Sequence, residues 1–161
     1  MFSVVTRSLC AIALLAATAA PGQLPPVPVS RESPWNGDWV LSRTRNTKDV
    51  MEGAAEGYRF RLDQDGRIRW EIPTLDEVVE GRTDGKPMAI RRPGAEGQTL
   101  AVTAEGPYTL RYSVAKGGKA LGEGRMTLVE QGKAWVDITQ AAGRPDVAHV
   151  VIYVRPSDAD Q

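Results

Sequence analysis

The stretch "YRFRLDQDGRIRWEI", which runs from Tyr58 to Ile72, determines the fold class of this chain. Apolar and charged residues alternate on both sides of a central turn, and a period of two is typical of amphipathic β-strands. Residues 63–66 (DQDG) suit a type I turn that ends on a glycine in the left-handed region. This turn would pair three apolar residues of each strand: Leu62 with Ile68, Phe60 with Trp70, and Tyr58 with Ile72. A slip of one residue would expose half of them, so the sequence predicts a hairpin with a well-specified register.

The same alternation continues along the chain in short segments. Four of them are residues 99–104 (TLAVTA), 108–115 (YTLRYSVA), 133–139 (KAWVDIT) and 146–155 (DVAHVVIYVR). Two more short strands are expected on either side of a turn at residues 83–85, and no window keeps the helical period over a useful length. About eight to ten sequential strands joined by tight turns predict a meander, which closes into a barrel to remove its unpaired edges. We therefore expect an all-β, antiparallel up-and-down barrel whose first and last strands pair.

The first residues carry the features of a secretory signal. One positive charge, Arg7, precedes an uncharged apolar run at residues 9–20, and residues 17–19 (Ala-Thr-Ala) provide a small-x-small cleavage pattern. The run is too short to span a bilayer, so no integral membrane span is expected. The prediction is an exported, periplasmic protein with a signal peptide at residues 1–19, a proline-rich linker at 20–34, a barrel domain at 35–156 and a C-terminal tail at 157–161.

Composition excludes several classes of chemistry. The only cysteine, Cys10, lies in the predicted signal peptide, so the exported chain would have no disulfide, zinc–thiolate site or cysteine nucleophile. The full chain has 20 basic and 20 acidic residues, and loss of Arg7 leaves 19 against 20. A chain without a basic excess is a poor binder of nucleic acid. We expect no cofactor, no metal and no nucleic-acid partner, and the sequence carries no signal for an oligomeric state.

A Gly-x-Trp pattern opens the first expected strand, in the segment "NGDWVLSRTRN" at residues 36–46. The segment combines with a DGK turn at residues 84–86, a KGGK turn at 116–119 and the exported single-domain length. Together these features resemble lipocalin-like proteins, and more narrowly an uncharacterised group of secreted bacterial lipocalin-like proteins. The resemblance covers Trp35 to about Pro156, and it implies a lipocalin-like barrel.

Lipocalins commonly lay a late basic residue over the tryptophan of this pattern, and the resemblance assigns that role to Arg155. In a closed meander, the start of the first strand, at Trp39, would lie beside the end of the last strand. The guanidinium would then cover the indole and seal that end of the barrel, and Gly37 would permit the close approach. The alternative places Trp39 among aliphatic side chains and Arg155 in solvent.

Five aromatic residues are expected to point into the barrel and are candidates for a ligand pocket: Tyr58, Phe60, Trp70, Tyr108 and Tyr112. Small barrels either fill their interior with side chains or hold one small ligand. Tyrosine suits a pocket because its ring is apolar while its hydroxyl finds a partner. The alternative is a packed core, and a contiguous internal cavity lined by these residues would distinguish the two.

Arginines occupy the opposite face of the hairpin at four positions: Arg59, Arg61, Arg67 and Arg69. The expected register places Arg61 opposite Arg69, and this like-charge pair is unfavourable unless an anion or a carboxylate lies between them. The functional interpretation is an anion-contacting patch. The alternative is a solvated outer face whose long side chains extend into water.

No arrangement typical of catalysis is present. His149, the only histidine, shares a strand face with apolar residues, and no serine lies in a G-x-S-x-G elbow, so it is expected to be a barrel histidine bonded to a neighbour or to solvent. The carboxylates near residues 76–80 are expected to belong to a charged loop. The sequence thus predicts a non-catalytic protein that holds a small, mostly apolar molecule in a β-barrel. The alternative is a structural or interaction module with a solid core, whose arginine face docks on a partner in the cell envelope.

Export can be checked directly. N-terminal sequencing of the protein recovered from the periplasm is expected to begin at or near Ala20, because cleavage should follow residues 17–19. An intact Met1 in the envelope fraction would contradict the predicted signal peptide.

Overall fold

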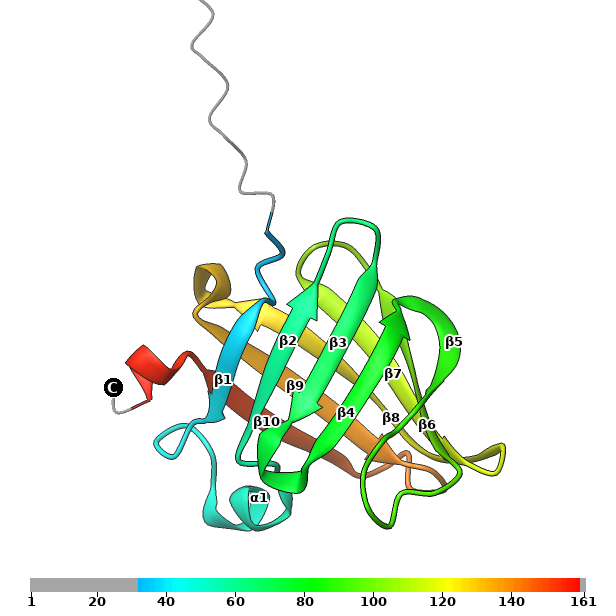
Figure 1. Ribbon diagram of the computed structural model, residues 1–161. Coiled ribbons are helices and arrows are strands. Elements are labelled where there is room, and N and C mark those ends of the chain that lie inside the picture. The colour runs from blue at the N-terminus through cyan, green and yellow to red at the C-terminus, as the bar shows by residue number, and fades with distance from the viewer. Residues whose placement is uncertain (1–31, 160–161) are drawn as a thin grey trace, which may run out of the picture.

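The computed structural model describes residues 32–159, and ten antiparallel strands form one continuous sheet that curls into a barrel (Figure 1). The strands are β1 (Gly37–Leu41), β2 (Gly57–Leu62), β3 (Arg67–Ile72), β4 (Glu77–Arg82), β5 (Asp84–Ala89), β6 (Gln98–Ala104), β7 (Thr109–Lys116), β8 (Lys119–Val129), β9 (Ala134–Ala141) and β10 (Ala148–Val154). Their order around the sheet is β4-β3-β2-β1-β10-β9-β8-β7-β6-β5. The predicted all-β, up-and-down barrel is confirmed. The predicted signal peptide and most of the linker lie outside the described residues.

The first and last strands close the sheet on one side of the barrel. β1 pairs antiparallel with β10, with Val40 opposite Val154, while its other edge pairs with β2. The predicted hairpin of β2 and β3 is also confirmed, since Phe60 lies opposite Trp70 and Leu62 opposite Ile68. Gly66 ends the turn between them with a φ of +76°, in the left-handed region that glycine adopts without strain.

The side of the barrel between β4 and β5 is the least paired. The sequence predicted two short strands joined by a turn here, but no ladder forms between β4 and β5 in the described chain. A single isolated bridge joins Val78 of β4 to Arg91, two residues beyond the end of β5. Two backbone hydrogen bonds of 2.9 Å make that bridge. Beside it, the side chain of Met88 packs onto Gly81, where a Cβ atom would overlap its sulfur. The barrel is therefore closed here mainly by side-chain packing, with little backbone pairing.

A short helix, α1 (Lys48–Gly53), covers one end of the barrel between β1 and β2. The sequence did not predict it, because six residues are too few to show a helical period. Asn46 ties the start of this connection to the sheet, since its amide nitrogen donates to the Ile152 carbonyl at 2.8 Å and its amide oxygen accepts from the Ile152 N–H at 2.9 Å. Three 3-10 turns complete the described chain: η1 (Pro73–Leu75), η2 (Glu130–Gly132) and η3 (Pro156–Asp158). No helix within residues 32–159 has the length and apolar character needed to cross a membrane.

Candidate functional site

Aromatic rings in mutual contact occupy the interior of the barrel. Ring centroids lie 5.0 Å apart for Phe60 and Trp70, and 4.3 Å apart for the stacked pair Trp135 and Tyr153. Tyr58 lies between them, with its centroid 5.4 Å from that of Trp135. Further rings join from Trp35, Trp39 and Tyr112. Four of the five aromatic pocket candidates belong to this cluster, and none of these four lines any of the hollows described along residues 32–159.

Tyr108 is the candidate that the structure places elsewhere. Its side chain is 56% exposed, not directed into the barrel. The reason is the turn before β7: the N–H of Glu105 donates to the carbonyl of Thr109, so Tyr108 belongs to the turn and the inward alternation begins only after it. Tyr108 lines an open hollow of about 600 Å³ at the end of the barrel, together with Pro34, Leu62 and Pro107 among other residues.

The predicted contact of Arg155 with Trp39 is present. The guanidinium carbon lies 3.6 Å from the centroid of the indole ring. The same guanidinium donates to the backbone carbonyls of Asn36 at 2.9 Å and Pro34 at 2.7 Å. Gly37 has a φ of +109°, and a Cβ atom there would lie 3.1 Å from Arg155 Nη1, so glycine is required both by the backbone and by the close approach.

The sequence did not identify Trp35 as a core residue. Arg155 helps to position it by donating to the carbonyl of Pro34, the residue before it. The indole N–H of Trp39 donates to the Trp35 carbonyl at 2.9 Å, and the Trp35 ring is fully buried against Phe60 and Trp135. The indole N–H groups of Trp35 and Trp135 have no hydrogen-bond partner among residues 32–159, and both rings make edge-to-face contacts with other aromatic rings. The segment before β1 is thus part of the core.

A buried polar cluster interrupts the aromatic interior. The hydroxyl of Tyr112 donates to Asp137, with oxygen–oxygen distances of 2.9 and 3.1 Å, and lies 2.6 Å from Thr139 Oγ1. Burial raises the pKa of Asp137 to about 6, although hydrogen bonds from Tyr112 and Thr139 oppose the rise. The strand alternation in "WVDIT" already places Asp137 on the face of Trp135, so a signal for this buried carboxylate was present in the sequence.

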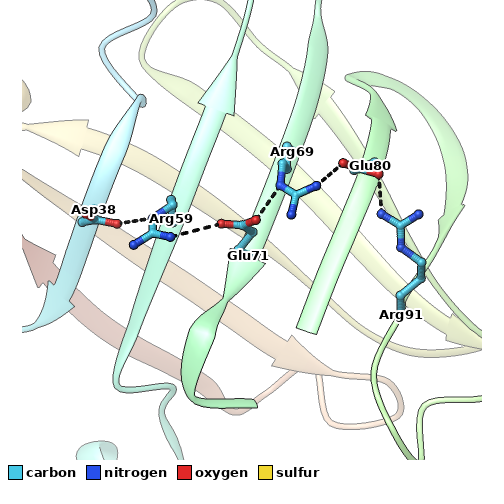
Figure 2. Close-up of polar contacts among 6 residues, drawn as sticks. All are labelled: Asp38, Arg59, Arg69, Glu71, Glu80 and Arg91. Carbon is cyan, nitrogen blue, oxygen red and sulfur yellow. Dashed lines mark hydrogen bonds and ion pairs between the residues drawn. The ribbon is translucent and has the colours of Figure 1, made fainter. Parts of the chain in front are cut away.

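Ion pairs connect four strands on the outer face of the barrel (Figure 2). This charge ladder consists of Asp38, Arg59, Glu71, Arg69, Glu80 and Arg91 in that order. Arg59 Nε lies 2.6 Å from Asp38, and Arg69 Nε lies 2.5 Å from Glu71. Hydrogen bonds from Arg91 and Arg69 lower the pKa of Glu80, while the carboxylates raise the pKa of Arg59 and Arg69. Carboxylates thus neutralise Arg69, one member of the like-charge pair that Arg61 and Arg69 form in the register.

The structure divides the predicted arginine patch into two parts. Arg59 and Arg69 belong to the charge ladder, whereas Arg61 and Arg67 make no ion pair with any residue in the described part of the chain. Arg82 joins the second group, because it lies opposite Arg67 in the β3–β4 register and donates to the backbone carbonyl of Asp65.

Arg61, Arg67 and Arg82 border an open hollow of about 650 Å³, here named the arginine hollow. Its lining residues are Asn36, Arg61, Leu62, Asp63, Arg67, Ile68, Arg69, Glu80, Gly81 and Arg82. Sequence reasoning missed Arg82 because pairing between β3 and β4 was not predicted residue by residue. The hollow is the strongest candidate site on the described surface, since it combines a concave shape with guanidinium groups that lack carboxylate partners.

The remaining sequence candidates do not come together. His149 is exposed on β10, opposite Thr139. Glu77 lies at the inner start of β4, where burial raises its pKa and Arg92 approaches to 3.4 Å, whereas Glu80 is on the outer face in the charge ladder. Within residues 32–159, no group of three or more histidine, cysteine, aspartate or glutamate side chains has an arrangement that could hold a metal ion.

Comparison of the chain with protein-family models, with curated proteins and with solved structures gives no significant match. The function is therefore argued from the geometry of the described residues.

Replacing either partner of the Arg155–Trp39 contact tests its part in stability. Trp39→Ala is expected to lower the free energy of unfolding by about 3 to 5 kcal/mol, because it removes a buried ring. Arg155→Ala is expected to cost about 0.5 to 2 kcal/mol, the range of a cation–π contact. Urea unfolding measures both, with Arg111→Ala on the outer face of β7 as the control. Equal losses for Arg155→Ala and Arg111→Ala would contradict the contact.

The substitution Asp137→Asn is expected to make the stability of the folded protein less dependent on pH. The folded pKa of about 6 exceeds the unfolded value of 3.8, so protonated Asp137 contributes stability below about pH 4 that is lost as pH rises to 6. A rise of this size corresponds to about 3 kcal/mol at most. Asparagine keeps hydrogen-bonding groups without the charge, so its advantage over aspartate should grow between pH 4 and 7. Thermal unfolding at a series of pH values across this range measures the effect, with the exposed Asp146→Asn variant as control. If the stabilities of the wild type and of Asp137→Asn changed with pH in parallel, the argument would be contradicted.

Proposed function

We propose that this chain is an exported, non-catalytic interaction module with a lipocalin-like barrel, and that it docks through the outer face of β2, β3 and β4 on a partner that carries closely spaced anionic groups. The observation that carries the proposal is the arginine hollow, where Arg61 and Arg67 lack ion-pair partners among the described residues. Export rests on the predicted signal peptide, and the lipocalin-like relationship rests on the Gly-x-Trp strand and the Arg155 contact.

The filled interior supports a role on the outside of the barrel. Four of the predicted pocket residues contact one another or other core rings, and two of the tryptophans between them are fully buried. Close packing of this kind makes a stiff scaffold, because moving one ring displaces its neighbours. A stiff barrel holds outward side chains at fixed spacing, which suits recognition of a charged surface.

The charge distribution supports an anionic partner. The whole chain is balanced, with 20 basic and 20 acidic residues, so a positive region must arise from local arrangement. Three carboxylates neutralise much of the charge of Arg59, Arg69 and Arg91 in the ladder, leaving Arg61, Arg67 and Arg82 without a carboxylate partner within ion-pair distance among the described residues. On β7 and β8 the outward Arg111 and Arg125 instead share Glu105, at 3.3 and 3.2 Å. Positive charge is therefore concentrated on one side of the barrel.

Binding of fluorescently labelled heparin, a defined polyanion, tests the proposed docking face. The wild-type protein is expected to bind with an affinity that falls steeply as salt increases, because each neutralised charge releases counterions. The double variant Arg61→Gln, Arg67→Gln is expected to lose about tenfold or more in affinity, equivalent to at least 1.4 kcal/mol. The matched control Arg111→Gln, Arg125→Gln removes the same charge from the other side.

An equal loss in the two double variants would show that the polyanion senses net charge only, and it would overturn the docking face. Absence of heparin binding by the wild-type protein at low salt would do the same. Circular dichroism of each variant checks that the barrel is intact.

The hollow around Tyr108 favours a second candidate function, the binding of a small apolar molecule. Its walls include the apolar side chains of Pro34, Leu62, Pro107 and Tyr108, and it opens at the end of the barrel. An exposed tyrosine beside two prolines offers a flat apolar surface that such a ligand can cover.

The apolar dye Nile red tests this second function. If the hollow binds apolar molecules, wild-type protein should raise the dye's fluorescence, and Tyr108→Ala should raise the Kd for the dye about tenfold if the ring contributes 1.4 kcal/mol. Tyr112→Phe, which changes only the buried polar cluster, is the control and should keep the signal. A fluorescence rise that survives Tyr108→Ala would place the dye elsewhere.

A further inference from the structure

We propose that the arginine hollow is a binding site for the dianionic phosphate group of a phosphomonoester. This inference rests on the proposed docking function and names the group that the face recognises. The site consists of Arg61, Arg67 and Arg82, with the amide of Asn36 at its edge, while Arg69 forms a fixed wall.

The charge of the hollow matches a dianion. Four arginines and two carboxylates line it, which leaves a formal charge of +2 (four minus two). A phosphomonoester carries about −1.5 to −2 at neutral pH and presents three acceptor oxygens. A carboxylate carries one charge on two oxygens, so it would leave part of the guanidinium charge without a partner.

Strand pairing brings the guanidinium groups together from three strands. Arg67 on β3 lies directly opposite Arg82 on β4, and Arg61 on β2 lies opposite Arg69 on β3. Without an anion, the two pairs place like charges side by side, which is unfavourable across a strand pair. Glu71 and Glu80 neutralise Arg69, but no carboxylate within ion-pair distance among the described residues does so for the other three.

Neighbouring contacts hold two groups of the site in place, the guanidinium of Arg82 and the side-chain amide of Asn36. Arg82 donates one N–H to the backbone carbonyl of Asp65, which anchors one edge of its guanidinium and leaves its other donors available. Asn36 accepts the Leu62 N–H through its side-chain oxygen at 2.6 Å, so its amide NH₂ group remains as a donor where the residue lines the hollow. Guanidinium forks and amide donors are the groups that bind phosphate oxygens with the best geometry.

Titration of the purified protein with inorganic phosphate, followed by amide chemical shifts in NMR, tests the site. At about pH 7.5 we expect saturable shifts around residues 61–67 and 81–82, and we expect acetate at the same concentrations to cause none. Arg61→Gln and Arg67→Gln are each expected to weaken binding about tenfold, equivalent to 1.4 kcal/mol. Arg111→Gln on the opposite face is the matched control and should leave the affinity unchanged.

A pH series separates the dianion from nonspecific screening. Inorganic phosphate changes from mostly the dianion to the monoanion as pH is lowered from about 7.5 to 5, so its affinity should fall over this range. Sulfate stays dianionic and should keep its affinity. Shifts that are unsaturable, or equal for acetate and phosphate, would overturn the site. If heparin binding depends on Arg61 and Arg67 while phosphate fails to bind, this inference fails and the proposed docking function stands. If neither heparin nor phosphate binds, both the docking function and the phosphate site are overturned.

Vesicles distinguish the two sources of a phosphomonoester. Sedimentation with phosphatidylcholine vesicles that contain phosphatidic acid, but not with pure phosphatidylcholine, would assign the group to a lipid headgroup. Phosphate binding without vesicle binding would assign it to a soluble ligand. Vesicle binding that is unchanged by Arg61→Gln and Arg67→Gln would count against the site.

Discussion

The contact between Arg155 and Trp39 is the constraint on which the barrel depends. One guanidinium covers the indole at 3.6 Å and also holds the carbonyls of Pro34 and Asn36. The segment before β1 is thereby fixed to the end of β10, and Trp35 is held inside the barrel. Since β1 pairs with both β2 and β10, the same contact secures the junction where the first and last strands meet. A single side chain thus couples closure of the sheet to filling of its interior.

A filled interior has a direct consequence for function. Four of the five rings that were candidates for a pocket pack against one another, and the described hollows lie on the outside and at the end of the barrel. On the outer face, strand register decides which charges meet. Glu71 and Glu80 each bridge two arginines (Figure 2). The arginines beyond their reach line a hollow. The ladder and the hollow are therefore adjacent parts of one outer face. The arginines of the ladder are neutralised by carboxylates, whereas Arg61, Arg67 and Arg82 remain available to an anion.

Local pattern in the sequence was enough to predict much of the fold. Period-two alternation identified β2 and β3, and Gly66 at the turn determined their register, because a one-residue slip would expose the apolar face. The same register predicted that Arg61 lies opposite Arg69, as the structure shows. Closure of the meander, together with the Gly-x-Trp resemblance, also predicted the Arg155–Trp39 contact. These features were predictable because each depends on residues adjacent in sequence or on the simple requirement that strand edges be paired.

By itself, then, the sequence determined the strand pattern, the hairpin register and the face of most alternating residues. Only the tertiary structure decided what those faces meet. It placed Tyr108 in a turn, packed Met88 onto Gly81 on the sparsely paired β4–β5 side, and buried Asp137 beside Tyr112. It also placed Arg82 beside Arg67 and around one hollow with Arg61, next to the neutralised ladder that shares Arg69 and Glu80 with it. The physical reason is distance along the chain: alternation determines direction locally, whereas packing and charge compensation depend on partners that strand pairing brings together.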